Sequence, residues 1–148
     1  AGRKRPACPD TAPAPAAKGD DVVVAWYTAA NDEPALQLAL SRDGGATFAM
    51  PVRVGRGAAV LGRADVAYDS SGAWVLWLRE DAGVQSLWLA RYSPDLKREI
   101  RRTEIAKLQG RGHATGFPKL ALRADGAYAV WTDVVERQPR LRGVQVLR

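Results

Sequence analysis

The sequence predicts an all-β chain that forms part of a β-propeller, and three observations carry this prediction. A short apolar strand that ends in Trp occurs three times, with Trp26, Trp77 and Trp131 as its last residues. These residues are 51 and 54 positions apart, close to the length of a four-stranded propeller blade. The flanking segments alternate apolar and polar side chains, a period of two that favours strands over helices.

The repeat divides the chain into about three four-stranded blades of one partial propeller, residues 1–148, which is half of a six-bladed ring. Two segments fit less well. Residues 12–17 should be a weak inner strand because prolines cannot donate to a sheet, and residues 95–108 could be helical, although the repeat favours a strand there. We place the three blades at about residues 8–56, 60–109 and 114–148.

Composition excludes several classes of partner. The chain of 148 residues has a formal net charge of +6, but its Lys and Arg are scattered and are not interleaved with aromatic residues, so we expect no nucleic-acid partner. No stretch approaches the roughly 20 apolar residues of a membrane span. Cys8 is the only cysteine, so it cannot form an intrachain disulfide, and the sequence does not identify a partner for it. We expect no metal and no cofactor, since no cluster of soft ligands is visible.

One turn motif is more specific than the repeat. Ser41, Asp43, Gly45, Thr47 and Phe48 follow the pattern Ser-x-Asp-x-Gly-x-Thr-aromatic, the Asp-box (BNR) motif. An Asp in such a turn can accept hydrogen bonds from turn amides, Gly permits positive φ, and Phe48 can pack beneath the turn. A degenerate copy, residues 93–96, stands at the corresponding place in the second blade, 16 residues after its Trp, against 15 in the first.

With this motif, the pattern from Cys8 to Val146 resembles bacterial sialidase-like BNR-repeat propellers, specifically their C-terminal half. The resemblance implies a sialidase-like propeller fragment that binds a glycan or a protein partner without complete catalytic machinery. It also implies an exported chain, periplasmic or extracellular, with a lipoprotein as one alternative for the full-length protein. In this family Asp-boxes lie away from the catalytic centre, so we expect Asp43 to be structural.

Strand direction assigns the loops to two ends of the predicted propeller, and the longer, charged loops share one end. Function commonly resides on such loops over a rigid scaffold. Arg63 could be one of the arginines that clamp a carboxylate in sialidases, although Lys119, in a similar place, cannot replace a bidentate Arg. The candidate ligand-binding residues are Arg63, Asp65, Lys119, Asp133 and His113.

Each candidate also has a structural interpretation. His113 is favoured as an exposed loop residue, because no nucleophile or metal partner is visible around it. Asp65 and Asp133 could bind a metal or a sugar hydroxyl, but such residues more often accept hydrogen bonds from backbone amides. The repeated Trp residues, with Tyr68 and Tyr128, are expected in the core. No catalytic residue is assigned.

Three functions remain open from the sequence. The first is a glycan- or partner-binding propeller fragment. The second is the C-terminal half of an active exo-sialidase or related glycoside hydrolase whose catalytic residues lie mostly upstream. The third is a protein-interaction scaffold. In each, an open arc of three blades exposes its end sheets, so either upstream blades or a second copy of the chain is expected to cover them.

Overall fold

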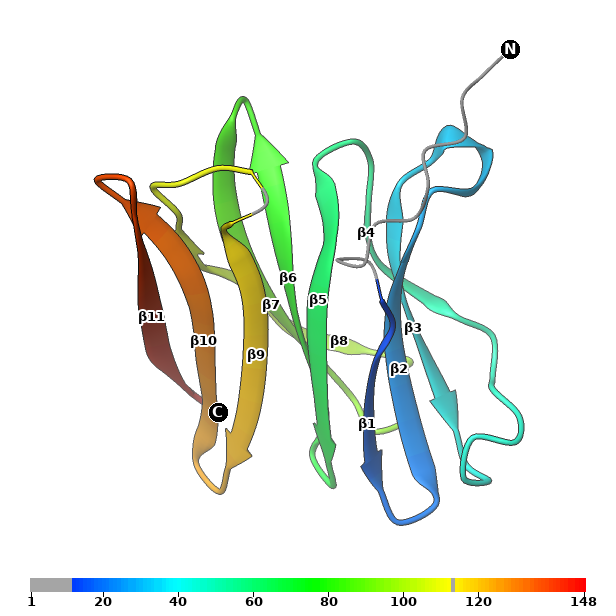
Figure 1. Ribbon diagram of the computed structural model, residues 1–148. Helices are drawn as coiled ribbons and strands as arrows, with labels where there is room; N and C mark the ends of the chain where they lie inside the picture. Colours follow the sequence, from blue (N-terminus) through cyan, green and yellow to red (C-terminus); the bar gives the residue numbers. More distant parts are fainter. Residues whose placement is uncertain (1–11, 113) are drawn as a thin grey trace.

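The computed structural model describes residues 12–112 and 114–148 as an all-β fold of three antiparallel sheets (Figure 1). Within these residues the only helix is the single 3₁₀ turn Ala30–Asp32, so none has the length and apolar character that crossing a membrane requires. The first sheet contains β1 (Ala14–Lys18), β2 (Asp21–Thr28), β3 (Ala35–Ser41) and β4 (Val52–Arg56). The second contains β5 (Val60–Asp69), β6 (Gly72–Asp81), β7 (Val84–Tyr92) and β8 (Glu99–Lys107), and the third contains β9 (Gly116–Arg123), β10 (Gly126–Val135) and β11 (Gln138–Leu147).

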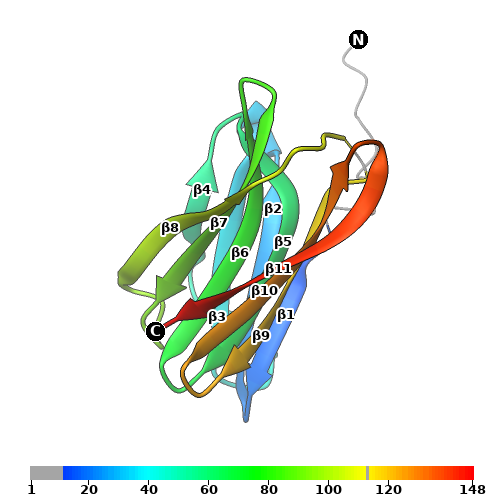
Figure 2. The ribbon, with the colours of Figure 1, turned by 90° about the vertical axis from the view of Figure 1, so that its left-hand side faces the viewer.

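Each sheet is a meander in which strands adjacent in sequence are hydrogen-bonded neighbours. The orders are β1-β2-β3-β4, β5-β6-β7-β8 and β9-β10-β11. The sheets stand side by side with their first strands, β1, β5 and β9, next to one another (Figure 1). Figure 2 shows the twist of the sheets, which carries their last strands away from these first strands.

Antiparallel order separates the loops into two groups at opposite ends of the strands, as the sequence predicts. The tight hairpins β1–β2, β5–β6 and β9–β10 share one end with the β3–β4 and β7–β8 turns (Figure 1). The β2–β3, β6–β7 and β10–β11 loops and the two connections between sheets lie at the other end. We call the end of the strands at which this second group of loops lies the connection end.

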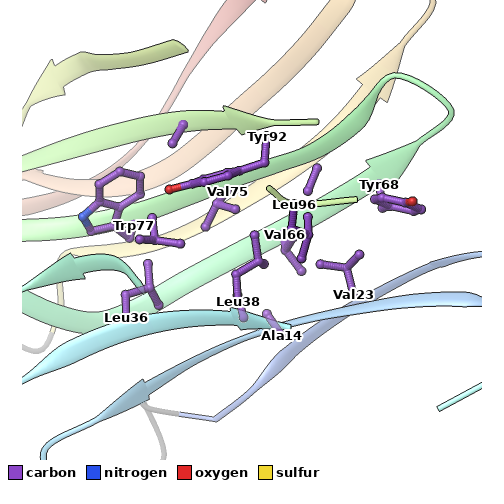
Figure 3. Packing of buried hydrophobic residues seen from close by; sticks show 14 of the residues in the cluster. Ala14, Val23, Leu36, Leu38, Val66, Tyr68, Val75, Trp77, Tyr92 and Leu96 are labelled. Atoms are coloured by element: carbon purple, nitrogen blue, oxygen red, sulfur yellow. The ribbon is translucent and has the colours of Figure 1, made fainter. Parts of the chain in front are cut away.

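Two apolar clusters hold the sheets together, and the second sheet contributes to both. Between the first and second sheets, Leu36 and Leu38 pack with Val75, Trp77 and their neighbours (Figure 3). Between the second and third sheets the cluster contains Trp74, Leu76, Leu78, Leu87, Leu89, Ala127, Ala129 and Trp131. Every residue from Gly72 to Leu78 is therefore buried, because β6 is covered on both faces.

The repeat observed in the sequence corresponds to a repeat in packing. Trp77 points toward the first sheet and Trp131 toward the second, so each packs on the sheet that precedes its own. Trp26 occupies the same position in β2 but no described sheet precedes it, and its side chain is only partly buried. The prediction that all three Trp residues lie in the core is therefore wrong for Trp26.

Tyr128 is a second correction to the predicted core. It lies on the face of β10 that points away from the second sheet and is 44% exposed, whereas Tyr68 is 8% exposed, as predicted. The two differ because Tyr68 lies on the face of β5 covered by the first sheet, while the side of the third sheet that carries Tyr128 has no neighbour among the described residues.

The two doubtful segments are both strands. β1 pairs with β2 from Ala14 to Lys18, and Pro15 is tolerated because β1 is an edge strand. β8 pairs with β7 along its whole length, with two register shifts, so the helical alternative for this segment is wrong.

Candidate functional site

A cavity of about 350 Å³ lies where the first strands of the three sheets meet. Its walls come from β1 and the residues just before it, from β5 and from β9. The cavity contains three of the five candidate ligand-binding residues, Arg63, Asp65 and Lys119, together with the ring of Phe117. This volume lies at the lower end of the range for small-molecule sites.

Arg63 is fixed by the connection between the second and third sheets. One of its guanidinium nitrogens donates to the carbonyl oxygen of Gly112, at 2.8 Å, and to that of Thr115. The guanidinium carbon lies 4.9 Å from the centroid of the Phe117 ring, a cation–π contact. These contacts hold the positive charge at the wall of the cavity at the connection end.

The backbone at the start of β9 is shaped around Arg63. Gly116 has φ +89°, and a Cβ there would lie 2.9 Å from Leu78 Cδ2 and 3.3 Å from Arg63 Cδ, so only Gly fits. Phe117 also has a positive φ, 50°, which is unusual for an aromatic residue. Strained backbone of this kind concentrates at functional sites, and here it presents a half-exposed ring to the cavity.

Asp65 and Lys119 form the opposite charges of the cavity. Asp65 Oδ2 accepts a hydrogen bond from the Leu120 amide at 2.8 Å, which joins β5 to β9. Its other oxygen lies 4.0 Å from Lys119 Nζ, and the Lys119 side chain is 70% exposed. Asp65 is therefore largely committed to joining the sheets, while the ammonium group of Lys119 is open to a ligand.

The remaining two candidates do not join this cavity. Asp133 is buried, and its carboxylate accepts hydrogen bonds from the amides of Gln109, Gly110 and Val134 at 2.8–3.2 Å. This is the backbone-binding role that the sequence offered as the alternative to a ligand site. His113 lies outside the described residues.

The Asp-box residues form a closed hydrogen-bond network at the β3–β4 turn. Asp43 accepts from the Thr47 amide (2.9 Å), the Thr47 hydroxyl (2.6 Å) and the Ser41 hydroxyl (2.7 Å). These bonds, that of the Thr47 hydroxyl first, lower the pKa of Asp43 to about 2. Gly45 donates to Ser41 Oγ at 2.8 Å with φ +91°. Both carboxylate oxygens of Asp43 are used within the turn, which leaves it no role toward a ligand.

The aromatic residue of the motif behaves differently from the rest. Phe48 lies against Val24 and Trp26 on the outer face of the first sheet and stays 46% exposed. The degenerate copy in the second sheet keeps the polar network, since Asp95 accepts from the Ser93 hydroxyl and the Lys97 amide. Leu96 there has φ 61°, close to the 70° of Gly44, and its side chain is buried.

A Tyr–Glu pair, which the sequence did not identify, lies outside the cavity. The Tyr92 hydroxyl donates to Glu99 Oε2 at 2.9 Å, and Arg102 binds the same carboxylate at 2.8 Å. Burial, and then the hydrogen bond to Glu99, raise the pKa of Tyr92 to about 12. The Tyr92 ring is buried in the core cluster at the end of β7 and Glu99 begins β8, so the pair stabilises the β7–β8 turn and the core beside it.

Four arginines from three strands also meet at one surface. Arg53, Arg56, Arg79 and Arg102 line a cavity of about 390 Å³ between the first and second sheets. Three of them have acidic partners: Glu33 for Arg53, Asp81 for Arg79 and Glu99 for Arg102. No local motif could reveal this group, because its members come from three separate strands, β4, β6 and β8. Its charges are mostly balanced internally.

The comparisons with known proteins add no relative. The chain matches no protein-family model, no curated protein and no solved structure. Among the described residues there is also no group of three or more His, Cys, Asp or Glu side chains that could hold a metal ion.

Proposed function

We propose that this chain is part of a sialidase-like β-propeller and that it binds an acidic sugar in the cavity between β1, β5 and β9. The observation that carries the proposal is the meeting of Arg63, Lys119 and Phe117 in one cavity. Two positive charges suit a carboxylate, and a half-exposed aromatic ring suits the apolar face of a sugar. The adjacent first strands of the three sheets would line the centre of the propeller.

The proposed role is binding, without catalysis by the described residues. A glycosidase needs two carboxyl groups, or a carboxyl and a phenol, on opposite sides of the scissile bond. Among the described residues that line the cavity, Asp65 is the only one with a carboxylate, and it already accepts the Leu120 amide. The Tyr–Glu pair described above, with Tyr92 buried and Glu99 exposed, lies outside this cavity. The alternative of an active exo-sialidase would need its catalytic groups from sequence outside these 148 residues.

Titration with N-acetylneuraminic acid tests the proposal, with N-acetylmannosamine as the neutral control. We expect saturable binding of the acid near ~1 mM or tighter and no binding of the neutral sugar. Lys119→Ala should weaken binding by about tenfold, the worth of one charge-assisted hydrogen bond. Lys97→Ala, an exposed lysine in the β7–β8 turn, is the matched control and should bind as the wild type does. Equal affinities of Lys119→Ala and wild type, or equal binding of both sugars, would contradict it.

A protein-interaction scaffold is the second candidate, and one observation favours it. The outer face of the first sheet has an apolar groove of about 360 Å³, lined by Val24, Trp26, Ala39, Phe48, Ala49 and Pro51. Exposed apolar patches of this kind mark interaction surfaces. The two roles are compatible, because this groove is lined by none of the residues that line the sugar-binding cavity.

A further inference from the structure

Each interface between neighbouring sheets joins two different kinds of face. The face toward the preceding sheet carries the repeated Trp: Ala73, Val75 and Trp77 in β6 pack on the first sheet. The face toward the following sheet is made by the intervening residues, such as Trp74 and Leu76 of β6, which pack on the third sheet. We call these the leading and trailing faces of a sheet.

The leading face of the first sheet has no partner among the described residues. By position in the repeat, Val22, Val24 and Trp26 correspond to Ala73, Val75 and Trp77. The three residues of the second sheet are buried, whereas Val22, Val24 and Trp26 are all partly exposed. Phe48, 46% exposed, extends this apolar surface. Met50, 89% exposed, stands in sequence between Ala49 and Pro51, which line the same groove.

The trailing face of the third sheet is exposed in the same way. Tyr128 and Val130 of β10 correspond to Trp74 and Leu76 of β6, which are fully buried. In the next strand, Leu141 of β11 corresponds to Leu87 of β7, and the two are 80% and 0% exposed. Apolar residues are thus kept at the positions that an adjoining sheet buries elsewhere in this molecule.

We propose that the leading face of one chain packs on the trailing face of a second copy, so that two chains close into one head-to-tail ring of six sheets. Both internal interfaces pair a leading with a trailing face, and this chain presents one unpaired face of each kind. Two leading faces, each with its Trp, have no precedent among the described residues. Because each copy supplies one face of each kind, a ring of two copies satisfies both pairings, provided that the rotation between neighbouring sheets closes the ring at six sheets.

The test is the mass of the full chain in solution by light scattering. We expect twice the 16.0 kDa of the single chain. Val24→Lys on the leading face and Val130→Glu on the trailing face should each give the monomer mass. Both positions are partly exposed in the single chain, so the variants should keep the wild-type circular dichroism. Lys97→Glu in the β7–β8 turn is the charge-change control and should stay dimeric.

Mixing the two monomeric variants separates head-to-tail pairing from other arrangements. A mixed ring brings the substituted leading face, with its added positive charge, against the substituted trailing face, with its added negative charge. The other interface of that ring keeps two wild-type faces, so the mixture should recover the dimer mass. A dimer through two leading faces would leave Val130→Glu dimeric on its own, which overturns the proposal. A monomeric wild type at about 100 μM, or an open series of larger masses, also overturns it.

Discussion

At the scale of single residues, Asp43 shows how the turn network links stability to pH. Its folded-state pKa of about 2 is below the ordinary value of 3.8, so the ionised carboxylate stabilises the fold. That contribution is complete above about pH 4 and is lost as the pH falls toward about 2. The Thr47 and Ser41 bonds are the cause.

Asp43→Asn should therefore lower the thermal unfolding midpoint at about pH 7, and its deficit relative to the wild type should shrink toward about pH 2. Thermal melts followed by circular dichroism at a series of pH values measure this. Asp20→Asn is the matched control, because the Asp20 side chain is exposed and only its backbone carbonyl takes part in the turn. A deficit that is the same at both ends of the pH range would show that the network does not depend on the charge.

Asp133 makes a different prediction, because it is buried. Asp133→Ala removes the acceptor of three amides and should lower the free energy of unfolding by about 2–4 kcal/mol. Urea unfolding measures the loss. If Asp133 were instead a ligand residue, the variant would keep its stability and lose sugar affinity.

At the scale of strands, close backbone approach at the hairpins requires Gly. A Cβ at Gly126, the first residue of β10, would lie 2.0 Å from the carbonyl oxygen of Val146, and one at Gly72 would lie 1.9 Å from that of Tyr92. Gly126→Ala should therefore separate the ends of β10 and β11 and speed amide hydrogen exchange there. Gly55→Ala, whose Cβ would meet its neighbours at 3.4 Å or more, is the control. Unchanged exchange in Gly126→Ala would contradict the register.

Most of the strands could be predicted from the sequence because alternation and Gly-containing turns are local signals. β1 overlaps residues 12–17 and β8 lies within residues 95–108, the two segments in which the repeat favours strands. Which face of a strand is covered is not a local property: Trp26 and Tyr128 have the same local pattern as their buried counterparts. Their exposure depends on whether another sheet adjoins, and alternation along one strand carries no information about that.

The residues of the candidate site also differ in whether local sequence could reveal them. Arg63, Asp65 and Lys119 could be found because they lie near the start of β5 or β9, two strands that the repeat aligns with each other. The arginines at positions 53, 56, 79 and 102 and the Tyr92–Glu99 pair could not, since the twist that brings outer strands together has no signature in spacing. Asp133 was identified, but its role depended on which amides the fold placed beside it.

At the scale of the whole molecule, the shared second sheet should make unfolding cooperative. Val75 belongs to the cluster with the first sheet and Leu76 to the cluster with the third. Val75→Ala and Leu76→Ala should each lower the stability by about 1–4 kcal/mol and shift one common transition. Tryptophan fluorescence and far-ultraviolet circular dichroism should give the same midpoint in each variant. Two separated transitions would mean that the sheets fold independently.

The central claim is that the cavity between the first strands of the sheets binds an acidic sugar. The most direct measurement follows backbone amide shifts by nuclear magnetic resonance during titration with N-acetylneuraminic acid. We predict saturable shifts concentrated at Asp65, Phe117, Lys119 and their neighbours, with the Asp43 turn unaffected. Shifts confined to the cavity lined by Arg53 and Arg102, or no shifts at millimolar sugar, would contradict the claim.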